Sequence, residues 1–323
     1  MFAVTIGREI FAQLTANGLF RGTSYGLLGA GFALILGVTG RFHFAYGLTY
    51  TLAAYFAFTL HARGTWAGPF SNGIPFIIAG IIGILASSVV GVGIERFIYR
   101  PIAKRAGATA LLAIFIAALG LGIAGQSLIS LLWGQQSVGF YDRGNHLTKV
   151  GWRLWKVTFE NLDVIQSITS ITLIIVFSLI LRFTPLGRQM RATRVNPDLA
   201  TIIGINSKRI YLTCFFIGTL FCAVSAFWYG LQYTVNPDMG ARPVITAFVV
   251  AFLAGTASSP IRIFLTGVAL ALLEQWLSMF ISTQWTQTAV FVVLFVYLIS
   301  KSMSGTILGR QVKSIVTFQW ARS

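Results

Sequence analysis

Residues 184–208 read TPLGRQMRATRVNPDLATIIGINSK, and this polar stretch lies between two long apolar runs. Asn196 is a favourable N-cap residue, Pro197 suits the first position of a helix, and Gly204 can adopt the left-handed conformation that ends one. The stretch 196–204 therefore predicts a complete helix of about two turns.

This short helix is expected to have an apolar face, because Leu199, Ile202 and Ile203 stand at positions i, i+3 and i+4. Three basic residues come just before it: Arg188, Arg191 and Arg194. A helix of two turns is not stable alone, so it needs a surface to dock against. On the cytoplasmic side of a membrane, that surface could belong to a partner subunit. A solvated basic loop that obeys the positive-inside rule explains the arginines equally well.

The composition is that of a polytopic membrane protein. The chain has 323 residues, of which 56% are hydrophobic and only 10% are charged, with a mean hydropathy of +0.78. Its net charge of +16 comes from basic residues in short segments between apolar runs. Membrane topology explains this distribution better than nucleic-acid binding does, so we expect lipid and no nucleic acid as a partner.

Two smaller features agree with this class. Cys214 and Cys222 lie eight residues apart on one apolar run, or about 12 Å along a helix, which is beyond disulfide reach. We expect both to be packing residues. We expect no removable signal peptide either, because Glu9 comes early and the start of the chain lacks a basic segment followed by a cleavage site.

The apolar runs predict an all-α fold with about eight to nine transmembrane helices in one domain, residues 1–323. The runs cover residues 22–38, 44–60, 74–94, 106–134, 164–181, 210–231, 243–261, 263–281 and 289–300. Residues 1–20 are expected to form an interfacial or partly inserted helix. Residues 255–260 interrupt the seventh run, so the apolar piece before them is either a short crossing or a half-helix.

Charge in the connecting segments predicts the orientation. Residues 95–109 and 182–209 are strongly basic and are expected in the cytoplasm, the second holding six basic residues against Asp198 alone. Residues 135–163 carry mixed charge, so we expect them outside the membrane as a small hairpin. The basic tail that begins at Lys301 is expected in the cytoplasm.

The chain shows no pattern typical of an enzyme. His43, His61 and His146 lie far apart without metal-ligand spacing, and no phosphate-binding G-x-x-x-x-G-K-[ST] motif occurs. We therefore expect no catalytic residue, metal site or cofactor in this chain. Any ATP chemistry must belong to a partner.

Polar residues within or between the apolar runs are candidates for a translocation path. They are His43, Phe44, Tyr46 and Gly47 at a break between two runs, and Gln126 and Glu274 inside longer runs. The break can line a cavity, although an interfacial turn explains it nearly as well. A hydrogen-bonded packing residue is the simpler reading of Glu274, and a hydrogen bond between helices is the simpler reading of Gln126.

Three motifs carry a family resemblance. Residues 37–47 read GVTGRFHFAYG and resemble G-V-T-G-x-x-N-F-A-H-G; residues 95–101 read ERFIYRP and resemble E-R-x-x-Y-R-P; residues 186–206 contain L-G-R-x-x-R-A and G-I-N. With these motifs in order, residues 18–298 resemble the integral-membrane permease subunits of bacterial ABC importers for branched-chain and other hydrophobic amino acids.

The resemblance implies the ABC importer permease fold and a multi-pass protein of the bacterial inner membrane. It implies a second permease subunit, identical or related, two cytoplasmic ATPase subunits that bind ATP and Mg, and an external solute-binding protein. The chain would form the path for branched-chain or hydrophobic amino acids, or for a related small polar solute. The segment that couples to the ATPase would comprise Leu186, Gly187, Arg188, Arg191, Ala192, Pro197, Leu199, Ala200, Ile202, Ile203 and Gly204.

The chain departs from the family pattern near the expected path. His43 replaces the asparagine of the first motif, Tyr46 replaces its histidine, and Leu48 replaces the glutamate that follows. Amides, urea and aromatic acids therefore remain alternative substrates. An autonomous secondary transporter or channel is the alternative function, and the scarcity of intramembrane acids argues against it. A membrane-embedded enzyme ranks last, since no cluster of catalytic residues is found.

Overall fold

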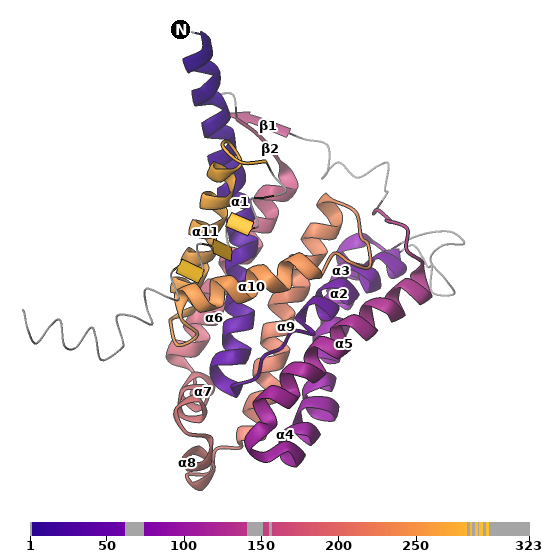
Figure 1. The fold of residues 1–323 in the computed structure, drawn as a ribbon, viewed down its shortest axis with the longest axis vertical. Coiled ribbons are helices and arrows are strands. Elements are labelled where there is room, and N and C mark those ends of the chain that lie inside the picture. Colours follow the sequence, from indigo (N-terminus) through magenta and orange to yellow (C-terminus); the bar gives the residue numbers. More distant parts are fainter. Residues whose placement is uncertain are drawn as a thin grey trace, which may run out of the picture.

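The computed structural model describes residues 2–61, 74–140, 151–154 and 157–282, with isolated positions between 285 and 296. These residues form an elongated helical bundle (Figure 1). In chain order the elements are α1 (Phe2–Thr39), α2 (Tyr46–His61), α3 (Phe76–Ile94), the π-helical turn η2 (Glu95–Tyr99), α4 (Arg100–Ala106), the 3-10 turn η3 (Gly107–Thr109), α5 (Ala110–Trp133), β1 (Gly151–Leu154), β2 (Val157–Glu160), α6 (Asn161–Phe183), α7 (Pro185–Val195), α8 (Pro197–Ile202), α9 (Ser207–Gln232), α10 (Ala241–Ala254) and α11 (Pro260–Leu277).

The all-α polytopic class is confirmed. Six helical segments of the described chain are long and apolar enough to cross a membrane: Glu9–Thr39, Phe76–Ala106, Ala110–Trp133, Asn161–Phe183, Ser207–Gln232 and Pro260–Leu277. The shorter helices α2 and α10 complete the bundle, which agrees with the predicted eight to nine. The predicted final run, 289–300, lies largely outside the described residues, as do His146 and the basic tail from Lys301. Cys214 and Cys222 are free and buried, as expected for packing residues.

The first helix differs from the prediction. An interfacial helix over residues 1–20 and a separate span from Gly22 were expected, but α1 continues unbroken from Phe2 to Thr39. Arg21 lies within the continuous helix, and its side chain donates a hydrogen bond to the Tyr233 hydroxyl at 3.2 Å. A charged side chain on a helix surface can keep its head group solvated or bonded in this way.

Three glycines on α1 allow close packing against α11. Gly18, Gly22 and Gly26 are spaced four residues apart, so they share one face of the helix. A Cβ on Gly22 would lie 2.7 Å from the Cα of Val268, and one on Gly26 would lie 2.6 Å from the carbonyl oxygen of Phe264. Small residues at such spacing let membrane helices approach backbone to backbone. The α1 and α11 pair therefore depends on these glycines.

Changing Gly26→Ala should lower the melting temperature of the purified protein in detergent. The added methyl meets backbone atoms, which cannot rotate away, and overpacking of this kind costs about 1–3 kcal/mol. Gly93→Ala is the matched control, since a Cβ at Gly93 has no heavy atom nearer than 4.0 Å. Equal melting temperatures for the two variants would contradict the packing assignment.

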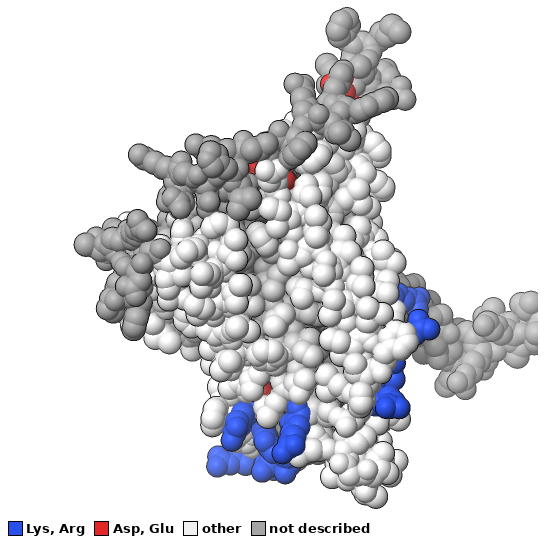
Figure 2. Space-filling model, turned by 180° about the vertical axis from the view of Figure 1, so that it is seen from behind, with Lys and Arg blue, Asp and Glu red and all other residues white. Residues whose placement is uncertain are grey.

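The two ends of the bundle differ in charge. Figure 2 shows Lys and Arg gathered in the lower half, including the region of α4, whereas Asp and Glu appear mainly near the opposite end. At that opposite end β1 and β2 pair antiparallel, and the Gln13 side chain donates to the Thr158 carbonyl at 2.8 Å. The predicted hairpin within 135–163 is thus confirmed, although residues 141–150 and 155–156 lie outside the described chain. The positive-inside rule predicts that the α4 end faces the cytoplasm.

The basic segments predicted as cytoplasmic loops are largely helical. Residues 95–106 continue α3 through the π-helical turn η2 into α4. Pro101 stands in the first turn of α4, where a proline needs no hydrogen-bond partner for its nitrogen, so the helix can resume there. Within 182–209, α7 and α8 follow α6 directly.

The length and direction of α10 distinguish between the short crossing and the half-helix that were predicted before the break at residues 255–260. It has 14 residues and ends where Gly255 adopts a φ of +80°, so its length of about 21 Å is shorter than a bilayer core. In Figure 1 it lies across the bundle rather than along it. Its start meets the start of α2, because a Cβ on Gly47 would lie 2.8 Å from the Gly240 carbonyl oxygen. α10 is therefore a half-helix whose N-terminus lies beside that of another short helix.

Candidate functional site: a coupling segment and a split set of path residues

The capped helix predicted in the polar stretch is present as α8. The Asn196 side chain accepts two backbone N–H groups of the first turn, both at 3.0 Å. Pro197 is the first helical residue, and Gly204 has a φ of +87° in the turn that follows. The N-cap and the left-handed exit are confirmed. The helix itself ends at Ile202, slightly earlier than predicted.

The apolar face of α8 points away from the rest of the chain. Leu199, Ile202 and Ile203 are 59%, 79% and 72% exposed, whereas Ala200 on the other face is 2% exposed. α8 therefore rests on the bundle through a small residue and presents large apolar side chains outward, at one extreme end of the molecule (Figure 1). Exposed apolar residues grouped in this way are typical of surfaces that contact a protein or a membrane.

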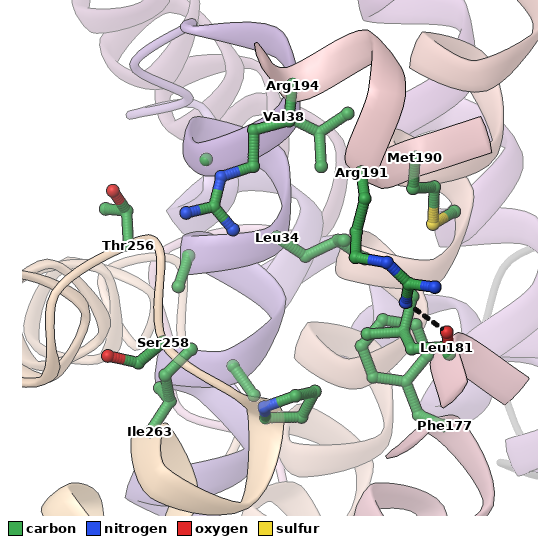
Figure 3. Close-up of a pocket in the computed structure, with 14 residues that line it drawn as sticks. Leu34, Val38, Phe177, Leu181, Met190, Arg191, Arg194, Thr256, Ser258 and Ile263 are labelled. Carbon is green, nitrogen blue, oxygen red and sulfur yellow. Dashed lines mark hydrogen bonds between the residues drawn. The ribbon is translucent and has the colours of Figure 1, made fainter. Parts of the chain in front are cut away.

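α7 is fixed to the membrane bundle behind α8. The Arg191 guanidinium donates to the Leu181 carbonyl in the last turn of α6, as the dashed line in Figure 3 shows. This contact places a cation at the negative end of the α6 dipole. Gly187 also lies against that turn, since a Cβ there would lie 2.0 Å from the Leu181 oxygen. Met190 is only 1% exposed.

A small cavity of about 60 Å³ lies where α7 meets the bundle. Its lining residues come from α1, α6, α7, the turn before α11 and the first turn of α11; those labelled in Figure 3 include Leu34, Val38, Phe177, Met190, Arg194 and Thr256. The space can hold only a few water molecules. Because several elements line this cavity, we interpret it as a packing gap at the place where α7 contacts the rest of the bundle.

The residues predicted to couple to an ATPase all lie at this end of the molecule. Leu186, Gly187, Arg188, Arg191 and Ala192 are on α7; Pro197, Leu199, Ala200 and Ile202 are on α8; Ile203 and Gly204 form the turn after it. Their functional role stays a prediction.

Two of the family-like motifs meet in space. Arg41 of the first motif forms a buried ion pair with Glu95 of the second, and the two residues are 9% and 1% exposed. His43 Nδ1 lies 2.9 Å from the Tyr99 hydroxyl, which joins the same two motifs a second time. The segment between α1 and α2 is thereby attached to the π-helical turn after α3.

His43 and Tyr46 are fully buried packing residues. Burial lowers the pKa of His43 to about 3, so its imidazole is neutral, and its ring lies 5.0 Å from that of Phe215. The Tyr46 hydroxyl donates to the carbonyls of Leu28 and Gly218 at 3.2 and 3.1 Å. Tyr46 thus connects α2 with both α1 and α9.

Phe44, Gly47 and Gln126 occupy a different environment. All three line a groove of about 320 Å³ between α2, α5 and the start of α10. The Gln126 side chain donates to the Asp238 carboxylate, in the segment between α9 and α10. Of the predicted path residues, the structure brings these three together.

Glu274 lies apart from both groups. It lines a cavity of about 580 Å³ and accepts a hydrogen bond from the Tyr25 hydroxyl at 2.9 Å. Glu274 is thus hydrogen-bonded and also faces an open space, and its role in a translocation path stays a prediction.

Sequence comparison decides the family. A sequence profile described as "Branched-chain amino acid transport system / permease component" matches residues 14–299. The chain belongs to this permease family. The high-affinity branched-chain amino acid transport system permease protein LivH of Escherichia coli (strain K12) is 29% identical over 303 residues, which cover 93% of this chain and 96% of LivH. BraD of Pseudomonas aeruginosa, with the same description, is 27% identical with the same coverage.

Among solved structures, PsaBC from Streptococcus pneumoniae in complex with Fab is similar to this permease. The match has a TM-score of 0.45 and 15% identity, and it covers 92% of this chain and 93% of that chain.

Sequence reasoning missed three charged residues of this permease that face cavities. Arg21 and Arg242 line the same cavity as Glu274, and Asp238 lines both this cavity and a neighbouring one beside α5. A signal was present for Arg21 and Arg242, since each stands directly before an apolar run. Charges at such positions usually mark only the end of a span.

Proposed function

We propose that this permease forms the translocation path of an ATP-driven importer in the bacterial inner membrane, with branched-chain or other hydrophobic amino acids as substrates. The observation that carries the proposal is α8, a capped helix whose large apolar residues are exposed while its neighbour α7 is fixed to the bundle. Membership of the permease family and the names of the relatives LivH and BraD support the substrate class.

The partner at α8 is proposed to be a cytoplasmic ATPase subunit. Leu199, Ile202 and Ile203 would insert into an apolar groove of the ATPase, and the exposed Arg188 would favour an acidic rim. Movement of α8 would pass through α7 to α6 by way of the Arg191 and Leu181 contact. ATP and Mg would be bound by that partner and not by this chain.

A second permease subunit is proposed to cover α5. This helix is the least buried of the six candidate spans, and a cavity of about 590 Å³ along it is lined by Gln126, Ser127, Ser130 and Asp238. Polar groups of this kind are costly against lipid. Facing a second subunit across a hydrated path would satisfy them, and an external solute-binding protein would deliver substrate to that path.

The test is purification of the complex followed by transport in proteoliposomes. We expect ATPase subunits to co-elute with this permease, and leucine uptake to require internal ATP and external solute-binding protein. Uptake by this chain alone, driven by an ion gradient, would instead show an autonomous secondary transporter.

A further inference from the structure

The cavity of about 580 Å³ lies toward the hairpin end of the bundle. Gln166 lies in the second turn of α6, which begins directly after β2, and Glu274 lies in the last turn of α11. Tyr233 directly follows α9, whose last residue, Gln232, donates a hydrogen bond to Asp163 in the first turn of α6. The volume of the cavity is in the range of small-molecule sites. The cavity therefore opens in the half of the membrane that is proposed to face outward.

Charged side chains of both signs line this cavity. Arg21 and Arg242 contribute two guanidinium groups, while Glu274 and Asp238 contribute two carboxylates. Among these four described residues no guanidinium forms a direct salt bridge with a carboxylate. Three of them hydrogen-bond with neutral groups: Arg21 donates to the Tyr233 hydroxyl, Glu274 accepts from the Tyr25 hydroxyl, and Asp238 accepts from the Gln126 amide.

A neutral amide also lines the cavity. Gln166 is only 7% exposed, and it is one of the residues that line the cavity. A buried polar group normally finds a partner in the protein, in water or in a ligand. The arrangement therefore offers separated positive, negative and neutral hydrogen-bonding groups to whatever enters.

We propose that this cavity is a substrate site within the permease that binds a zwitterionic α-amino acid. Arg242 and Arg21 receive the carboxylate, and Glu274, held by the Tyr25 hydroxyl, receives the ammonium group. Gln166 supplies a further hydrogen bond. The inference rests on the proposed function and adds to it a site whose chemistry selects amino acids over the alternatives.

The charges decide between the substrate classes that the sequence left open. Urea and simple amides are neutral, so they would leave both guanidinium groups and Glu274 without a charged partner in a site near lipid. An aromatic acid without an amino group would satisfy the arginines and repel Glu274. An amino acid alone among these classes matches both signs.

Protection of an introduced cysteine tests the proposal in the complete transporter. Ser24 lines the cavity, and the native cysteines are both buried, so Ser24→Cys should be the main site of reaction with a thiol reagent. Leucine at about ten times its dissociation constant should slow the reaction about tenfold. Leucinamide, which lacks the carboxylate, and the corresponding α-keto acid, which lacks the ammonium group, should protect far less.

Charge removal provides the second half of the test. In the Ser24→Cys background, Arg242→Gln and Glu274→Gln should each raise the leucine concentration needed for protection by about tenfold or more. Arg262→Gln is the matched control, because Arg262 lies at the other end of α11 and does not line the cavity. Thr246→Cys is a second reporter on the cavity wall if Ser24→Cys does not assemble.

Two results would overturn the inference. If wild-type transporter imports leucine but leucine protects neither cysteine, the cavity is not a substrate site, and the proposed function still stands. If leucinamide protects as well as leucine, recognition of the carboxylate is wrong. Failure of the wild-type complex to import any amino acid would instead contradict the proposed function.

Discussion

Replacing Glu95 with alanine should destabilise the permease by about 3–5 kcal/mol, because it leaves the buried guanidinium of Arg41 without its carboxylate. Arg41 is 9% exposed, and its guanidinium also lies 5.2 Å from the centre of the Tyr211 ring. That ring attracts the cation only weakly compared with a carboxylate. The measurement is thermal unfolding of the purified permease in detergent.

The control for this prediction removes both charges. Arg41→Met combined with Glu95→Leu leaves no unpaired ion, and buried pairs replaced by apolar residues are often close to neutral in stability. The double variant should therefore recover most of the stability lost in Glu95→Ala, and a double-mutant cycle of Arg41→Met, Glu95→Leu and the two combined should give a large coupling energy. If the two single effects simply add, the ion pair does not hold the two motifs together.

Local chemistry explains why α8 could be predicted from sequence. An N-cap, a proline at the first position and a glycine at the exit act within a few residues of one another, so Asn196, Pro197 and Gly204 are informative without any tertiary contact. The burial of Ala200 and the exposure of Leu199 could not be predicted. The periodicity shows that a face is apolar, but not whether that face packs on its own chain.

Contacts between distant segments explain what the sequence left undetermined. The first two motifs were recognised separately, yet nothing in their spacing shows that Arg41 would pair with Glu95 or His43 with Tyr99. The start of α1 shows the opposite error. Residues 1–20 were expected to form a helix separate from the run that starts at residue 22, but α1 continues unbroken through Arg21.

The candidate path was predicted in part. Phe44, Gly47 and Gln126 do line one groove, because the break before α2 and the start of α10 come together there. His43 and Tyr46 belong to the same break but turn inward to bond with other helices. Side-chain direction after a break depends on backbone geometry, which residue type does not determine. Residues 43–47 therefore point into two different environments.

Combining Leu199→Asp with Ile203→Asp should reduce leucine uptake and transport-stimulated ATPase activity by about tenfold or more. Each buried aliphatic side chain contributes about 1.5–3 kcal/mol to a contact, and the loss of two exceeds the 1.4 kcal/mol that corresponds to tenfold in affinity. The bundle itself should be unaffected, because both residues are mostly exposed. The measurement is uptake and ATPase activity in proteoliposomes.

Thr201→Asp is the matched control on the same helix. Thr201 lies on the side that faces Ser207, with their hydroxyl oxygens 3.1 Å apart, so the change adds one negative charge, half of that in the double variant, without altering the apolar face. Its uptake should stay close to wild type. A double variant that melts at the wild-type temperature, loses uptake and no longer co-elutes with the ATPase locates the coupling contact at α8. If that variant transports normally, the force from the ATPase enters the bundle at another surface, and the exposed leucine and isoleucines of α8 have a different role.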